Sequence, residues 1–194
     1  HEGSGDVFVA EADESDASFL RYTPIVAIIT NVEADHLDHY GTAEAVEDAF
    51  VAFTDRIVPG GALVVCVDDV GAARVAQRAR QRRGDDLTVI TYGQRAGVDV
   101  RLVALAPAER GVAVTFQPRP GLAFAAREVP VVLRVPGRHN AANAAAAWTA
   151  GAWLGVDAAC LAEGLAGFGG TRRRFELKGE AAGVQVRDDY SHHP

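Results

Sequence analysis

The chain has 194 residues, of which 48% are hydrophobic and 23% charged, and its formal net charge is -7. This composition predicts a folded protein with a buried core and excludes a disordered tail, a collagen-like fibre and a disulfide scaffold. The acidic balance disfavours broad binding to nucleic acid or to an anionic membrane surface, because such binding requires a basic face. No apolar run reaches the roughly 20 residues of a membrane-spanning helix, and the first residues lack the basic and apolar regions of a signal peptide. We therefore expect a soluble cytoplasmic protein.

The first half of the chain alternates strand-like and helix-like segments. Short apolar runs rich in β-branched residues predict buried strands at residues 7–10, 25–30, 62–67 and 87–92. Helices are expected over 43–57, with Thr42 as N-cap, and over 70–83, ending at Gly84. This alternation predicts an α/β fold with a mostly parallel central sheet flanked by helices. Such sheets bind ligands at the carboxyl ends of their strands.

The pattern changes after Gly97. Three strand-like runs broken by proline and glycine predict a small antiparallel meander at residues 98–105, 112–117 and 129–135. From Asn140 the chain becomes helical, and a further helix is expected over 158–165. Two more strands are expected at residues 175–178 and 184–187. We expect one domain over 1–187 and the start of a second at 188–194.

An acidic loop, Glu11-Ala12-Asp13-Glu14-Ser15-Asp16, follows the first predicted strand. Like charges at the end of a strand are unfavourable unless a cation or backbone amides offset them, which makes Mg²⁺ a natural partner. The alternative is a solvated loop that leads into a helix, because acidic residues also suit the first turn of a helix. Spacing alone favours neither interpretation.

A second polar loop, residues 31–40, follows the strand at 25–30 and should reach the same edge of the sheet. His36 could ligate a metal or contact a phosphate, and Asp35 could orient the imidazole. A structural hydrogen-bonding role for His36 is the alternative. A rival chemical interpretation is a metal-dependent phosphohydrolase with a dinuclear centre. Its candidate ligands are Asp35, His36, Asp38, His39, His192 and His193.

Two features of the second half favour an anionic or planar ligand. Residues 136–140 join a strand to an alanine-rich helix on which Asn140 and Asn143 share a face. Residues 171–176 form a cationic patch whose arginine side chains match phosphate oxygens. The alternatives are that Asn140 caps the helix and that the patch is a solvated turn. The only lysine, Lys178, is followed by glycine, so these residues contain no Walker A loop.

Five motifs, taken together, resemble the Mur ligase family and occur in that family's order. They lie at residues 10–16, 30–38, 136–144, 173–176 and 188–194. The resemblance implies an ATP-dependent amide-bond former of peptidoglycan synthesis that acts through an acyl phosphate. Two motifs, EADESD and DDYSHHP, are most similar to the member that adds L-alanine to UDP-N-acetylmuramate. A ligase that recycles murein peptides, or another Mur ligase, stays open as the alternative.

The resemblance also implies roles for individual residues, with ATP and Mg²⁺ as cofactors. Glu11 and His36 would be catalytic and would hold the Mg²⁺. The ATP site would comprise His139, Asn140, Asn143, Arg173, Arg174 and Asp189. Further substrate contacts would come from Asp13, Glu14, Ser15, Asn31, Tyr190, His192 and His193.

The chain resembles only part of that family's architecture. It is similar to the central ATP-binding domain without its phosphate-binding loop, up to the first residues of the C-terminal domain. We therefore expect these residues alone to bind ATP poorly and to catalyse nothing. No lysine lies between Tyr40 and Pro59, so a second metal site built on a carbamylated lysine is not expected. The sequence does not indicate an oligomeric state.

Overall fold

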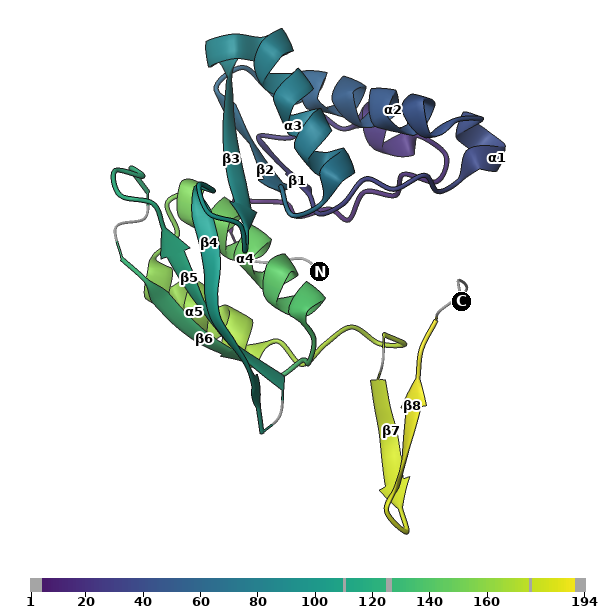
Figure 1. Cartoon of the computed structure of the whole chain (residues 1–194), viewed down its shortest axis with the longest axis vertical. Helices are drawn as coiled ribbons and strands as arrows, with labels where there is room; N and C mark the ends of the chain where they lie inside the picture. The colour runs from purple at the N-terminus through teal and green to yellow at the C-terminus, as the bar shows by residue number, and fades with distance from the viewer. Residues whose placement is uncertain (1–4, 110, 125–126, 175, 191–194) are drawn as a thin grey trace. The chain divides into compact units, whose positions relative to one another are not determined.

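The computed structural model describes residues 5–109, 111–124, 127–174 and 176–190. The chain divides into two compact units, residues 1–101 and 102–194 (Figure 1). Six strands form one sheet in the order β1-β2-β3-β4-β5-β6, and β7 and β8 form a separate two-stranded sheet.

The strands of the larger sheet match the predicted segments after residue 25. They are β1 (Val26–Ile29), β2 (Gly61–Cys66), β3 (Leu87–Gly93), β4 (Val100–Ala108), β5 (Gly111–Pro118) and β6 (Val129–Leu133). The pairs β1–β2, β2–β3 and β3–β4 are parallel, whereas β5–β6 is antiparallel. The predicted α/β class is confirmed, as is the mostly parallel sheet with an antiparallel addition.

The helices lie before, between and after these strands in the sequence. They are η1 (Ser18–Arg21), α1 (Leu37–Tyr40), α2 (Ala43–Asp55), α3 (Val70–Arg83), η2 (Gly84–Asp86), α4 (Arg138–Trp153) and α5 (Ala158–Gly167). The predicted N-cap of α2 is confirmed, because the Thr42 side chain accepts a hydrogen bond from the Ala45 amide at 3.1 Å. The predicted range of α3 is also confirmed. No helix in the described part of the chain is long and apolar enough to cross a membrane.

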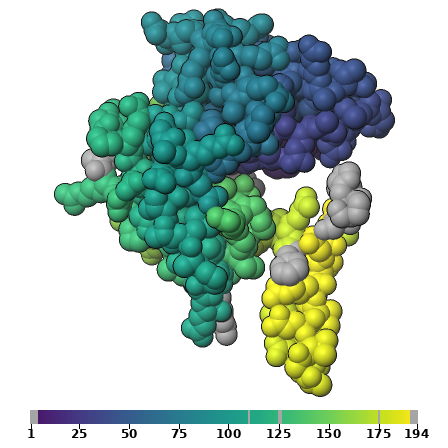
Figure 2. Space-filling model, in the orientation of Figure 1, coloured from purple at the N-terminus to yellow at the C-terminus, as the bar shows by residue number. Residues whose placement is uncertain are grey.

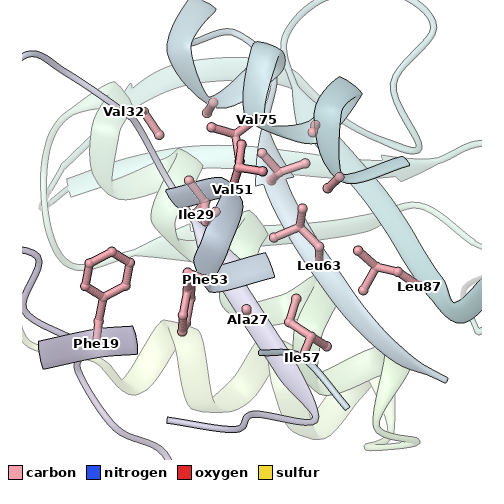
Figure 3. Close-up of a cluster of buried hydrophobic side chains, with 14 of the residues drawn as sticks. Phe19, Ala27, Ile29, Val32, Val51, Phe53, Ile57, Leu63, Val75 and Leu87 are labelled. Carbon is pink, nitrogen blue, oxygen red and sulfur yellow. The ribbon is translucent and has the colours of Figure 1, made fainter. Parts of the chain in front are cut away.

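The core of the first unit lies between α2, α3 and one face of β1 to β3. Figure 3 shows Val51 and Phe53 of α2 and Val75 of α3 directed at the same cluster as Ile29 and Leu63. Each such side chain contributes roughly 1.5–3 kcal/mol when it is fully buried. This core fixes β1, and with it the start of the polar loop that follows Ile29.

Arginines of α3 pair with acidic side chains of α2 on the outside of this core. The ion pairs are Arg74–Glu47, Arg78–Asp48 and Arg82–Asp55. The two helices pack side by side, and their side chains form a continuous surface (Figure 2). Exposed ion pairs of this kind each contribute little to stability. They place the basic side chains of α3 next to the acidic side chains of α2, so that opposite charges face each other.

In the second unit, α4 packs on β5, and α5 packs on α4 and β6. The rings of Phe116 on β5 and Trp148 on α4 lie 5.7 Å apart between their centroids. A Cβ atom at Gly151 would lie 2.5 Å from the Leu161 side chain, so glycine permits the close approach of α5 to α4. These contacts fix α4, whose first two turns carry Asn140 and Asn143.

The prediction of a strand at residues 7–10 is wrong. The structure has no strand there, and Phe8 is 85% exposed. Strand propensity measures how well a residue fits a paired and half-buried surface, and this segment pairs with no described strand. An apolar, β-branched run therefore does not make a strand without a partner.

The last two predicted strands form a hairpin of β7 (Glu176–Ala181) and β8 (Val184–Asp188). Of these two segments, Phe175 lies outside the described residues. The division into domains at residue 187 stays a prediction.

Candidate functional site

The acidic loop and the loop after β1 meet in the first unit. The Nε2 atom of His36 lies 3.8 Å from Oε1 of Glu14 and 4.0 Å from Oδ2 of Asp35. The contact with the acidic loop is therefore made by Glu14, whereas Glu11 is exposed. The family resemblance placed Glu11 and His36 together, whereas in the structure Glu14, three residues after Glu11, lies at the imidazole.

A small pocket of about 180 Å³ lies at this junction. Its polar lining comes from Glu14, Thr30, Asn31, Glu33 and Asp35. Carboxylate and amide oxygens are ligands that hard cations such as Mg²⁺ prefer. Within the described ranges, however, no three or more His, Cys, Asp or Glu side chains form a group that could hold a metal. A cation here would need further oxygens from a bound substrate or from water.

The backbone of the second loop is shaped around His36. This residue has a left-handed φ of 52° and precedes α1 as its N-cap residue. The Asp35 carboxylate accepts a hydrogen bond from the His36 amide at 2.8 Å. On α1, the Tyr40 hydroxyl donates a hydrogen bond to the backbone oxygen of Glu14. This hydrogen bond ties the acidic loop to the loop that carries the imidazole.

Two acidic residues of the first loop are already stabilised by backbone amides. Asp13 accepts a hydrogen bond from the Ser15 amide at 2.8 Å, and Asp16 accepts one from Ser18 at 2.9 Å. Hydrogen bonds lower the pKa of both carboxyl groups: for Asp13 the Ser15 amide is the main cause, and for Asp16 it is the Ser18 side chain, followed by the Ser18 amide. The backbone amides therefore offset part of the negative charge of this loop, which is one of the two possibilities that the sequence left open.

Asn31 lies at the start of the second loop and bridges its neighbours. Its Oδ1 accepts a hydrogen bond from the Thr30 hydroxyl at 2.9 Å, and its Nδ2 donates to Glu33 at 3.3 Å. Asn31 thus lines the small pocket together with Glu14, as the sequence analysis grouped them.

Sequence reasoning missed two residues that hold this loop in place. The Asp69 carboxylate accepts hydrogen bonds from the Val32 amide at 3.0 Å and from the Ala72 amide at 2.7 Å. A Cβ atom at Gly71 would lie 2.1 Å from the Val32 backbone oxygen. The first turn of α3 therefore rests directly on the loop after β1. An aspartate before a helix is a recognisable N-cap signal, but its second partner is distant in sequence.

A larger cavity of about 1040 Å³ lies in the second unit. Five of the six residues expected to bind ATP line it, namely His139, Asn140, Asn143, Arg174 and Asp189. Its apolar walls include Leu133, Val135, Ala144, Ala147, Leu165 and Phe168. The cavity thus combines apolar walls with a few polar groups, as small-molecule sites do. Phe168 was not singled out in the sequence.

The first turn of α4 forms one wall of this cavity. Gly137 is the N-cap residue, with φ of 102°, and a Cβ atom there would lie 2.6 Å from the His139 ring. The Asn140 Nδ2 donates a hydrogen bond to the Pro136 backbone oxygen at 2.6 Å. The interpretation of Asn140 as the helix cap is therefore wrong, because its amide group holds the preceding turn instead.

Arg173, the sixth expected residue, does not line the cavity. Its guanidinium carbon lies 4.6 Å from the centre of the Tyr190 ring. Its neighbour Arg174 and the neighbour of Tyr190, Asp189, do line the cavity.

Among the described residues, no His, Cys, Asp or Glu side chains gather in a group of three or more that could hold a metal, so the rival dinuclear site is not assembled there. His192 and His193 lie outside the described residues. The His39 ring contacts the edge of the Tyr40 ring, at 4.8 Å between centroids.

Comparison with known proteins identifies the family. Residues 2–151 match the Mur ligase middle domain. The chain is 56% identical over its whole length to the UDP-N-acetylmuramate--L-alanine ligase of Kineococcus radiotolerans and covers 39% of that protein. It is 50% identical to the ligase of the same name from Mycobacterium tuberculosis, covering 40% of it. The solved UDP-N-acetylmuramate-alanine ligase of Thermotoga maritima superposes with a TM-score of 0.74 at 27% identity, over 93% of this chain and 38% of that one.

The chain therefore belongs to the Mur ligase family. The family resemblance read from the five motifs is confirmed, whereas the phosphohydrolase interpretation is not supported. The chain spans about two fifths of the length of the curated relatives named above.

Proposed function

We propose that the chain is the central part of an ATP-dependent ligase that joins L-alanine to the lactyl carboxylate of UDP-N-acetylmuramate. The observation that carries the proposal is the 56% identity over the whole chain to a ligase of that name. The reaction consumes ATP to activate the carboxylate as an acyl phosphate, which the amine of L-alanine then attacks. This activity belongs to the cytoplasmic stage of peptidoglycan synthesis.

The cavity beside α4 is the proposed ATP site. Its apolar walls suit the faces of an adenine base. Asn140 uses its Nδ2 on Pro136, so it would offer its Oδ1 as an acceptor to the amino group of the base. Asn143 lies on the same side of the helix and lines the same cavity. Arg174 would contact the phosphates, and Asp189 would accept hydrogen bonds from the ribose hydroxyls.

The junction of the two loops is the proposed Mg²⁺ site. Glu11 and His36 would hold the ion, and Glu14 would orient the imidazole, since its carboxylate lies 3.8 Å from Nε2. A site with only a few protein ligands is consistent with Mg²⁺, because this ion usually keeps bound water and takes oxygens from substrate phosphates. When bound, the ion would reduce repulsion between the muramate carboxylate and the phosphates. Asn31, Asp13 and Ser15 would contribute to substrate contacts around this junction.

These 194 residues do not contain a Walker A loop. We expect them alone to bind ATP weakly and to release no phosphate in response to L-alanine. The complete reaction is proposed for the full-length gene product that contains this chain.

The test is phosphate release by the full-length gene product with ATP, Mg²⁺ and UDP-N-acetylmuramate. Release should require L-alanine and yield a UDP-N-acetylmuramate product extended by one alanine, detected by mass spectrometry. If a murein peptide is preferred to L-alanine as the substrate that is joined to UDP-N-acetylmuramate, the protein is the recycling ligase instead. Phosphate release from ATP without any amine or muramate would refute the ligase assignment.

A further inference from the structure

From the sequence alone, Arg173 and Arg174 are equally good candidates for binding phosphate, but the structure distinguishes them. Arg174 lines the large cavity, whereas Arg173 lies over the ring of Tyr190. Arg173 has a left-handed φ of 60°, so the chain changes direction between the two arginines. The side chains of these two consecutive arginines therefore lie in different environments.

Arg173 and Tyr190 are joined in two ways. The guanidinium carbon lies 4.6 Å from the ring centre, a cation–π geometry. The Tyr190 amide also donates a hydrogen bond to the Arg173 backbone oxygen at 2.7 Å. A third contact comes from β7, because the Arg173 amide donates to the Glu176 carboxylate at 2.9 Å. These contacts bring together segments that are 17 residues apart.

The positions next to this pair are the ones that reach the cavity. Arg174 follows Arg173, and Asp189 precedes Tyr190; both line the cavity. The Arg174 amide also donates to the Thr171 backbone oxygen at 3.2 Å, and Thr171 lines the cavity as well. The contact between Arg173 and Tyr190 therefore holds a cation and a carboxylate at the same opening.

We infer that Arg173 and Tyr190 form a clamp that positions Arg174 and Asp189 in the nucleotide site. Arg173 is a positioning residue that acts through Tyr190 and does not bind phosphate itself. Tyr190 likewise acts through its ring on the arginine and not through a substrate contact. The inference rests on the proposed function, since it takes the large cavity to be the ATP site.

A series of ligands separates a positioning role from phosphate binding. Adenosine, ADP and ATP are titrated calorimetrically into the full-length gene product and its variants. Arg173→Ala should weaken adenosine by about threefold, because Asp189 loses its support, and ADP and ATP by about tenfold, because Arg174 loses its support as well. Arg174→Ala should weaken ADP and ATP by about tenfold or more and leave adenosine unchanged.

Tyr190 provides the second arm. Tyr190→Leu should reproduce the effect of Arg173→Ala. The double variant should bind the ligands no more weakly than either single variant, because both substitutions remove the same contact. Tyr190→Phe keeps the ring and should retain most of the affinity. If Arg173→Ala lowers the thermal unfolding midpoint too far for titration, Arg173→Gln, which keeps the aliphatic stem, replaces it.

The outcomes are distinct. Loss of ADP and ATP binding with unchanged adenosine binding in Arg173→Ala would overturn the inference and make Arg173 a phosphate ligand. Additive losses in the double variant would overturn it too. If the unsubstituted protein binds none of the three ligands, the proposed nucleotide site itself fails, and the inference falls with it.

Discussion

The hydroxyl of Tyr40 donates a hydrogen bond to the backbone oxygen of Glu14, 26 positions earlier in the chain. Tyr40 also packs against the apolar core of the first unit. The core, α1 and the acidic loop are therefore linked through one side chain, close to the contact between Glu14 and His36. The spacing of the proposed Mg²⁺ site depends on a residue that holds no ligand itself.

Tyr40→Phe removes this hydrogen bond and leaves the packing of the ring. We expect a loss of about 0.5–1.5 kcal/mol in the free energy of unfolding. In the full-length gene product, half-maximal phosphate release should also require more Mg²⁺. Urea unfolding and a Mg²⁺ titration measure the two effects, with Tyr22→Phe at an exposed position as the control. A loss of stability with an unchanged Mg²⁺ requirement would show that the hydrogen bond does not shape the ion site.

Tyr40 should also leave a signature at alkaline pH. Burial raises the pKa of Tyr40 above its ordinary value of 10.0, with the Glu14 charge as a smaller cause. As the pH rises above about 10, the unfolded chain ionises before the folded protein, so the free energy of unfolding falls. The effect is absent below that pH.

Tyr40→Phe should therefore lose less stability than the unsubstituted protein as the pH rises through and above about 10. The measurement is urea unfolding at a series of pH values. Tyr92, whose pKa burial also raises, is present in both proteins, so the difference between the two curves isolates Tyr40. Parallel curves would contradict the assignment.

Gly71 should tolerate no side chain. A Cβ atom there would lie 2.1 Å from the Val32 backbone oxygen, so alanine must push α3 away from the loop after β1. We expect Gly71→Ala to cost about 1–3 kcal/mol. Gly164→Ala is a matched control within a helix, because a Cβ atom there would meet nothing within 4 Å. That change should be neutral or stabilise by about 0.5–1 kcal/mol. Equal unfolding midpoints for the two variants would refute the close contact.

These predictions mark the limit of what the sequence alone could give. The start of α2 and the end of α3 were predictable, because Thr42 caps the first and Gly84 follows the second, and both signals are local. The left-handed backbone of His36 and the short helix α1 were not predicted, because their conformation depends on contacts such as the one from Tyr40 to Glu14.

The candidate sites show the same division. Asn140 and Asp189 line one cavity although 49 positions separate them. No spacing rule joins such residues, and only the resemblance to a family grouped them. That resemblance could not distinguish Arg173 from Arg174, because the difference lies in how the backbone turns between them.

Asn140 should be sensitive to the loss of its donor. Asn140→Asp replaces the Nδ2 group with an oxygen that faces the Pro136 backbone oxygen, which had accepted the hydrogen bond at 2.6 Å. The turn before α4 should shift, and ATP binding should weaken by about tenfold. Asn143→Asp is the comparison, since Asn143 lines the same cavity on the same helix. It should affect ATP binding without lowering the thermal unfolding midpoint, whereas Asn140→Asp should lower both. Unchanged stability in Asn140→Asp would contradict the structural role of its amide.

Glu11 and Glu14 should differ in their effects on turnover. Glu11 is proposed to hold Mg²⁺, and Glu14 to orient the imidazole of His36 at 3.8 Å. Glu11→Gln should therefore reduce phosphate release by about 100-fold or more at every Mg²⁺ concentration, because the ion loses a charged ligand. Glu14→Gln should cost about tenfold and should recover partly at high Mg²⁺, since outer partners tune affinity.

Both glutamate variants keep the shape of the side chain, so the pair controls for packing. The measurement is steady-state phosphate release in the full-length gene product across a Mg²⁺ series. His36→Gln should resemble Glu11→Gln, because the imidazole is the other proposed ligand. If Glu14→Gln proves as severe as His36→Gln while Glu11→Gln remains active, the ion is held by the glutamate that contacts the imidazole. The assignment of Glu11 would then be wrong.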